Sequence, residues 1–212
     1  GNTVKVGVSV NYIANNYDVS SQAGNAYNNV LMSPMQVPLT RYRNWKTDPF
    51  ANPNGYYNEY YDNPYYTLQN NRSETRNNYL QGTLELKWNP IKPLTFTSRL
   101  GLSARDVFNK TYSGKFEYSD YTKSISGSSK TNDLGAVSDY GYKSNQLIVD
   151  LLAQYKTTFS DFSLNVVGGF QSRENTENSV AVGVNGLVIS GVYNVSNTLT
   201  NLGGGQYLTH TS

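Results

Sequence analysis

Alternating apolar and polar residues recur in five segments of the chain, and this period of two predicts β-strands. In the first segment, Val4, Val6, Val8 and Val10 alternate with Lys, Gly and Ser. Successive side chains of a strand point to opposite faces of a sheet, so the four valines share one face. The same pattern predicts strands near residues 3–12, 78–89, 94–104, 145–157 and 162–172.

Two short turns join four of the expected strands into antiparallel hairpins. Residues 89–93 include two prolines, which lack the N–H donor that a strand ladder requires. Residues 157–161 form the second short turn. The other connections are long and polar, and loops of more than about 15 residues usually have structure or function of their own. They span residues 13–77, 105–144 and 173–212.

The first long connection contains two segments with the signals of short helices. From Gly24 to Met32, Tyr27 and Leu31 stand four residues apart, which places them on one helical face. Farther along, Asn63 is suited to cap a helix and Pro64 to occupy its first position. We therefore expect one short helix in each of these segments.

Long and short connections alternate along the chain, and this asymmetry is typical of outer-membrane β-barrels. Such barrels have long extracellular loops and tight periplasmic turns, which would make residues 89–93 and 157–161 periplasmic. A strand of about ten residues crosses the hydrocarbon layer when tilted, and Trp88 would lie in an interfacial aromatic girdle. The expected fold is therefore all-β, with antiparallel strands that form part of a transmembrane β-barrel and extracellular loops that carry short helices. An open sheet of five strands cannot close, so we expect a barrel fragment.

Three consecutive strings of residues also resemble a known family. They are NPYYTLQNNR (63–72), R-x-x-Y-L-x-G-x-L-x-L-x-W (76–88) and PLTFTSRLGLS (93–103), and together they resemble part of the barrel of SusC/RagA-type TonB-dependent outer-membrane transporters. The later GVYNVSN (191–197) extends the resemblance over most of the chain.

The resemblance implies a nutrient importer in the outer membrane of a Gram-negative bacterium. Members of the family have a barrel filled by a plug domain, a SusD-type surface lipoprotein as a lid, and TonB as the source of energy for uptake of oligosaccharides or peptides. The sequence has no plug and no TonB-contacting segment, so contact with TonB would be made through absent parts of a longer chain.

Composition and charge exclude several other classes of protein. The 17 basic and 15 acidic residues give a formal charge of +2 and form no basic stripe, which argues against a nucleic-acid partner. The absence of Cys removes disulfides and thiolate catalysis. The single histidine, His210, lies near the end of the chain, away from any Ser and acid that would complete a catalytic or metal-binding set. We therefore expect no enzyme activity, no metal and no cofactor.

Aromatic residues gather in the first long connection, where Asn and Asp separate them. A Tyr side chain offers a flat apolar face and a hydroxyl, and Asn offers a donor and an acceptor, so together they suit stacking on sugars or binding of a peptide backbone. The alternative is that the rings pack the loop against itself. The candidate ligand-binding residues are Trp45, Tyr56, Tyr57, Tyr60, Tyr61, Tyr65 and Tyr66.

A second class of function fits the same sequence, a soluble or surface β-rich module that binds glycans or proteins. The two classes differ in what covers the apolar row of the strands. A spanning barrel leaves this row facing lipid, whereas a sandwich buries it against a second sheet. The deciding residues are Leu80, Leu84, Leu86, Phe96, Leu100, Leu102 and Leu151.

Overall fold

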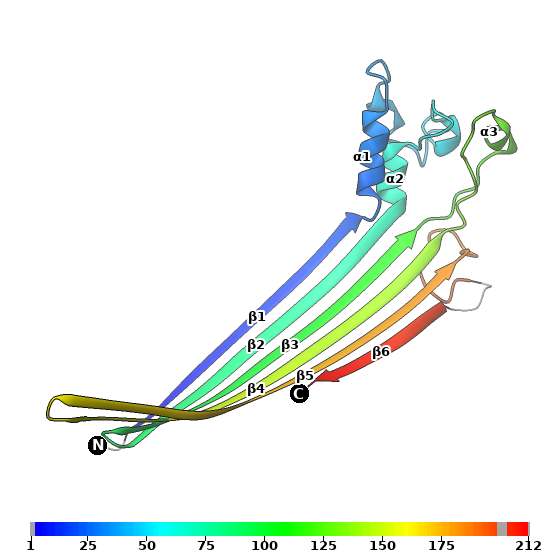
Figure 1. Ribbon diagram of the computed structural model, residues 1–212. Coiled ribbons are helices and arrows are strands. Elements are labelled where there is room, and N and C mark those ends of the chain that lie inside the picture. The colour runs from blue at the N-terminus through cyan, green and yellow to red at the C-terminus, as the bar shows by residue number, and fades with distance from the viewer. Residues whose placement is uncertain (1–2, 199–202, 212) are drawn as a thin grey trace.

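The computed structural model describes residues 3–198 and 203–211, which form one antiparallel sheet of six strands in chain order (Figure 1). The sheet is open, because β1 pairs only with β2 and β6 only with β5 among the described residues. The strands are β1 (Thr3–Ser20), β2 (Asn71–Ile91), β3 (Leu94–Ser113), β4 (Ala136–Phe159), β5 (Phe162–Asn185) and β6 (Gly203–Thr211).

Strands lie at all five places where alternation predicts them, and each extends beyond the predicted end. The long loops are correspondingly shorter than expected and span residues 21–70 and 114–135. The prediction of one loop over residues 173–212 is wrong, because β5 continues to Asn185 and a sixth strand, β6, follows. Alternation missed these extensions because both of their faces carry many polar residues, while the backbone ladder needs no apolar side chains.

Strand register is unbroken from β1 to β5 except for one irregularity between Trp88 and Ile91. This register gives the sheet one apolar face. Residues that pair across neighbouring strands lie at one level of the sheet, and one such level consists of Val8, Leu84, Leu100, Val149 and Ser172. The leucines and Phe96 that distinguish a spanning barrel from a sandwich lie on this apolar face and are exposed. No second sheet covers it in the described part of the chain.

The opposite, polar face carries charged and amide side chains in the same part of the sheet. Arg99 forms an ion pair with Glu85 at 2.6 Å, and Gln171 donates to Asp150 at 2.7 Å. The two faces of the sheet therefore differ sharply in chemistry, as alternation predicts for strands that separate two environments.

The β4–β5 hairpin extends past the other strands at the end of the sheet opposite the helices (Figure 1). The backbone N–H of Lys156 donates to the Pro93 carbonyl at 2.7 Å, and beyond this point β4 pairs with β5 alone. The hairpin closes at the pair Phe159 and Phe162, with Ser160 at a φ of 50° in the turn.

Three α-helices lie beyond the other end of the strands (Figure 1). They are α1 (Ala23–Leu31), α2 (Pro64–Asn70) and α3 (Asp120–Ser124). The two predicted helices are confirmed, and the Asn63 side chain caps α2 by accepting from the Tyr65 N–H at 2.9 Å. Helix α3 was not expected from the sequence.

The tightest packing in the molecule lies in this helical region. Tyr42, Ala51 and Tyr56 form one buried cluster, and Val137, Val184 and Leu187 form another. Partly buried side chains pack against each cluster. Asn63 lies fully buried beside the first cluster, and its side-chain N–H groups donate to the carbonyls of Tyr42 and Ala51, each at 2.8 Å.

Replacement of Asn63 by Ala should therefore loosen the segment 42–63 without affecting the sheet. The change leaves two buried carbonyls and the Tyr65 N–H without partners, and we expect it to cost about 1–3 kcal/mol of local stability. Limited proteolysis of the loop measures this cost. Asn28→Ala is the control, since Asn28 is an exposed residue of α1, and equal sensitivity of the two variants would contradict the role of Asn63.

Candidate functional site

Two loops from the helical end of the sheet pack against each other. The first loop (residues 21–70) joins β1 to β2, and the second loop (residues 114–135) joins β3 to β4. At their base the Gly114 N–H donates to the Asn70 carbonyl, and the Asn70 side chain donates to the Gly114 carbonyl, both at 2.9 Å. A Cβ on Gly114 would collide with the Asn70 side-chain oxygen, so this close approach requires glycine.

An ion pair between a buried lysine and a partly exposed aspartate also joins the two loops. The Lys130 ammonium of the second loop lies 2.5 Å from Asp62 Oδ1 of the first, and its side chain is only 3% exposed. It also donates to the Tyr61 carbonyl at 2.7 Å, and the Tyr118 hydroxyl donates to the same Asp62 oxygen at 2.8 Å. A buried ammonium costs free energy unless it is paired and hydrogen-bonded, and here both conditions are met.

A second carboxylate of the junction, Asp133, accepts a hydrogen bond from the Tyr66 hydroxyl at 2.7 Å. Burial raises the pKa of Asp133 above its ordinary value, the Tyr66 hydrogen bond opposes this, and the nearby Asp62 charge adds to it. Burial is also the main cause of the raised pKa values of the Tyr66 and Tyr118 hydroxyls, and the neighbouring carboxylates act in the same direction. Both tyrosines therefore stay protonated and act as hydrogen-bond donors.

Two of the candidate ligand-binding tyrosines lie buried inside the first loop. Tyr56 meets Tyr42 edge to face with ring centroids 4.9 Å apart, and burial raises the pKa of Tyr56 to about 12. Tyr66 meets Trp45 edge to face at 5.0 Å. The rings of Tyr56 and Tyr66 thus pack the loop, as the alternative interpretation of the cluster holds.

The other candidates are more accessible. Tyr57 and Tyr65 are half-buried against the cluster of Tyr42, and the half-buried Trp45 donates through its indole N–H to Gln69 at 3.0 Å. The rings of Tyr60 and Tyr61 form a pair of their own.

Tyr60 is 62% exposed and meets the half-buried Tyr61 edge to face at 5.0 Å. Asn58 Oδ1 accepts from both backbone N–H groups of the pair, at 2.8 and 2.7 Å. An exposed aromatic pair on an ordered backbone is an arrangement that suits stacking against a ligand.

Several residues of this region were missed by sequence reasoning. Tyr121 projects from α3 and is exposed, and the cap of that helix, in which Ser119 accepts from the Thr122 N–H at 3.1 Å, was a signal for its start. No sequence signal pointed to Lys130, because its partner Asp62 is 68 residues away.

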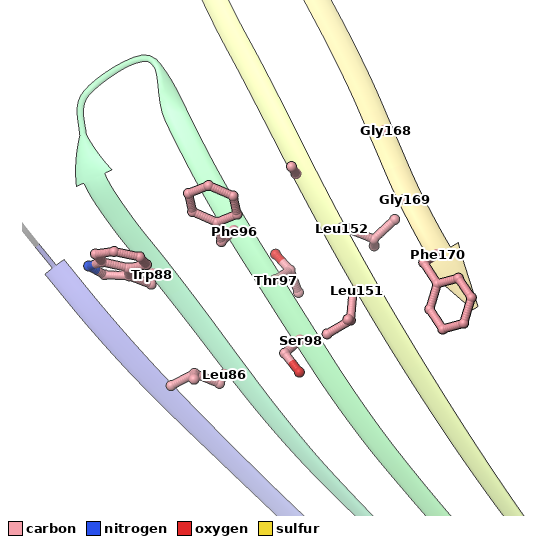
Figure 2. A pocket seen from close by; sticks show the side chains of 11 residues that line it. Leu86, Trp88, Phe96, Thr97, Ser98, Leu151, Leu152, Gly168, Gly169 and Phe170 are labelled. Atoms are coloured by element: carbon pink, nitrogen blue, oxygen red, sulfur yellow. The ribbon is translucent and has the colours of Figure 1, made fainter. Parts of the chain in front are cut away.

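A hollow of about 440 Å³ lies on the apolar face of the sheet (Figure 2). Trp88 and Phe96 stack at 5.6 Å on one side of it and Phe170 lies on the other. Small residues, Ala153 and Gly168 among them, leave the space between the rings open. The hollow has no titratable side chain in its lining, so it suits hydrocarbon and offers nothing for acid–base chemistry.

The described residues contain no group of three or more His, Cys, Asp or Glu placed to hold a metal ion. No helix in the same residues is both long and apolar enough to cross a membrane. His210 is part of β6, where its backbone pairs with that of Thr176.

Comparison with known proteins gives a similarity of fold. No protein-family model and no curated protein matches this sequence. Among solved structures, the chain is similar to a chain of the RagAB peptide transporter, with a TM-score of 0.59 and 14% sequence identity. The match covers 71% of this chain and 16% of the transporter chain, so this chain spans a small part of the length of that protein. At this identity the similarity concerns the antiparallel sheet alone.

The raised pKa of Asp133 predicts how the junction of the two loops responds to pH. A carboxyl whose pKa is raised on folding contributes stability below its ordinary pKa, and this contribution is lost as pH rises through the raised value. Asp133→Asn keeps an acceptor for Tyr66 but cannot ionise. We expect this variant to resist proteolysis in the second loop better than the unmodified chain at pH 7 and equally at pH 3. A larger gain at pH 3 than at pH 7 would reverse the sign and refute the prediction.

Proposed function

We propose that this chain forms part of the wall of a transmembrane β-barrel in an outer-membrane, TonB-dependent nutrient importer of a Gram-negative bacterium. The apolar face of the sheet meets lipid, and the polar face meets the interior of the barrel. The loops that carry the helices lie outside the cell, and the β2–β3 and β4–β5 turns lie on the periplasmic side. One observation carries the proposal, the slant of the apolar band across the strands.

The band of apolar side chains on the apolar face does not end at the same level on every strand. On β1 its last large side chain is Tyr12, and Ala14 and then the polar Asn16 and Asp18 follow toward the loops. On β5 its last large side chain is Phe170, which is followed on the same face by the polar residues Ser172, Glu174, Thr176 and Asn178 and only near the loops by three valines (Val180, Val182 and Val184). Register places Phe170 level with Val6, through a row that consists of Leu151, Ser98 and Leu86.

The upper limit of the band therefore falls by six residues in all from β1 to β5: it stays level with Tyr12 on β2, is level with Val10 on β3 and β4, and is level with Val6 on β5. The values that follow are averages over these four steps. Six residues correspond to about 20 Å along a strand, and four steps to about 19 Å across the sheet. The band thus crosses the strands at roughly 45°, which agrees with the tilt of about 35–45° that strands of membrane barrels adopt.

The same slant accounts for the protruding hairpin. On β4 the band runs from Leu147 to Phe159, twelve residues or about 40 Å along the strand, which is about 28 Å across a layer crossed at 45°. This height agrees with a hydrocarbon core of about 25–30 Å. The hairpin extends past β2 and β3 because the lower limit of the apolar band, like its upper limit, falls from β1 toward β5.

We propose that the barrel imports oligosaccharides or peptides and that a SusD-type surface lipoprotein covers its outer opening. The similar RagAB structure is that of a peptide transporter, which supports the class of function. Contact with TonB belongs to other parts of the parent protein. Within the first loop we assign ligand contact to Tyr60 and Tyr61 by their exposure. Trp45, Tyr57 and Tyr65 are half-buried further candidates, and Tyr56 and Tyr66 are buried packing residues.

The slanted band predicts different costs for the same substitution at one level of the sheet. Ile91 and Val166 lie level through Leu94 and Tyr155, and the two are 54% and 53% exposed. Val166 falls near the middle of the band on β5, whereas Ile91 lies at its lower limit on β2. We expect Val166→Arg to cost about 2–4 kcal/mol and Ile91→Arg about 0–1 kcal/mol, measured by reversible unfolding of the parent protein in lipid.

Thr97→Arg serves as the control, because Thr97 lies on the polar face. Its cost should be small. Equal costs at Ile91 and Val166 would show that the band is not tilted, and equal costs on the two faces would sink the barrel assignment altogether.

Truncation of the exposed rings tests the ligand surface. Tyr60→Ala should weaken binding by about 1–3 kcal/mol, in the range of an interface anchor, while assembly of the barrel stays normal. Calorimetry on the full-length protein with maltoheptaose and with a tryptic digest of casein measures the effect for the two substrate classes. Tyr27→Ala is the matched control, since Tyr27 is an equally exposed tyrosine on α1. If neither probe loses affinity in a Tyr60→Ala protein whose loop remains protease-resistant, Tyr60 is not a ligand contact.

A further inference from the structure

Two consecutive residues of the second loop hold the backbone of the exposed tyrosine pair. The Ser129 N–H donates to the Glu59 carbonyl at 3.3 Å, and its hydroxyl donates to the Tyr60 carbonyl at 2.9 Å. The Lys130 ammonium donates to the next carbonyl, that of Tyr61, at 2.7 Å. Three successive carbonyls of the first loop thus accept hydrogen bonds from two residues that lie about 70 positions later in the chain.

The N–H side of the same segment is held from within the first loop. Asn58 Oδ1 accepts from the N–H groups of Tyr60 and Tyr61. Every backbone polar group of the two tyrosines therefore has a partner, while the Tyr60 ring stays exposed. This is the arrangement of an anchor that is ordered before a ligand arrives, and order in the free protein reduces the entropy lost on binding.

The ammonium that completes this arrangement lies in an environment that is costly for a charge. The Lys130 side chain is almost fully buried, with Asp62 as its counter-ion and the Tyr118 ring centroid 5.8 Å away. The Asp62 side chain is 40% exposed, so the ammonium is the charge that loses its water, and this desolvation offsets part of the attraction within the pair. The contacts of this ammonium with Asp62 and with the Tyr61 carbonyl are directional, so they fix how the two loops lie against each other.

We propose that Lys130 is a positioning residue for the ligand surface, which holds Tyr60 and Tyr61 in their binding conformation without touching the ligand. The second loop thereby becomes part of the site that the first loop presents. The inference rests on the proposed function only in its assumption that the tyrosine pair contacts a ligand. Loss of the Lys130 contacts should weaken affinity by about tenfold, because two side chains must then be ordered on binding.

Hydrogen exchange on the full-length protein tests the positioning directly and needs no ligand. Lys130→Met keeps the aliphatic stem but removes the charge and the donors, and amides of residues 58–62 should then exchange at least about tenfold faster. Lys130→Arg keeps a charge and donors and should show a smaller increase. The matched control is Lys123→Met, since Lys123 forms an exposed ion pair with Asp120 at 2.9 Å on α3, and it should leave residues 58–62 unchanged.

Unchanged exchange at residues 58–62 in Lys130→Met overturns the proposal. An equal increase across the whole first loop also overturns it, because Lys130 would then support the loop in general. An increase confined to residues 58–62 and their contacts in the second loop supports it.

A double-mutant cycle with maltoheptaose and the casein digest extends the test to affinity. If Lys130 acts through the rings, Lys130→Met should lower affinity in the unmodified protein and have no further effect in a Tyr60→Ala, Tyr61→Ala background. Additive losses would mean that Lys130 acts elsewhere and would overturn the proposal. If loss of both rings leaves affinity unchanged, the ligand contacts proposed above fail, and the exchange experiment still decides whether Lys130 orders this segment.

Discussion

Continuous register across the sheet is the constraint on which the rest of the structure depends. Because side chains alternate between faces, a slip of one residue in any pair of strands would move every apolar side chain of a strand to the opposite face. The long ladders from β1 to β5 prevent such a slip and keep Val8, Leu84, Leu100 and Val149 on one surface. That surface has no protein layer over it in the described residues, and its apolar side chains are exposed.

The loops are ordered by a different kind of interaction. Few aliphatic residues lie buried there, and the first loop is held instead by tyrosine rings, the buried Asn63 and the ion pair of Lys130 with Asp62. Hydrogen bonds to buried groups are directional and costly to leave unmade, so such a network specifies one arrangement of two loops. The strands place the bases of these loops side by side, and the Asn70 and Gly114 contact at those bases begins the network.

The sequence predicts those parts of the structure that a local residue pattern marks. Strands were predicted wherever one face is apolar. Helix α2 was predicted because Asn63 is suited to cap a helix and Pro64 to occupy its first position. The strand extensions, as at Asn71 and Asn185, were missed because polar residues on both faces separate them from the apolar segments that mark the strands. The site was only partly predictable. Composition marks the tyrosine cluster, but only the structure shows that Tyr56 and Tyr66 are buried while Tyr60 is exposed. Lys130 could not be predicted, because it meets Asp62 only when the strand register brings the two distant loops together.

In the proposed orientation, the tilt also explains why the loops differ so much in length. Ser20 and Val184 lie level in register, yet they stand eight and fourteen residues above the band on β1 and β5. At a tilt of 45° these distances are about 19 and 33 Å above the hydrocarbon layer, so the base of the first loop is about 14 Å lower than the base of the segment that follows β5. In this orientation, helices α1 and α2 extend the first loop away from the hydrocarbon layer. Residues 186–198 instead fold back onto the sheet, where the Tyr193 ring stacks on the Tyr112 ring with centroids 4.0 Å apart. A long, internally packed first loop is therefore what a tilted wall requires if segments from low and high bases are to build one surface.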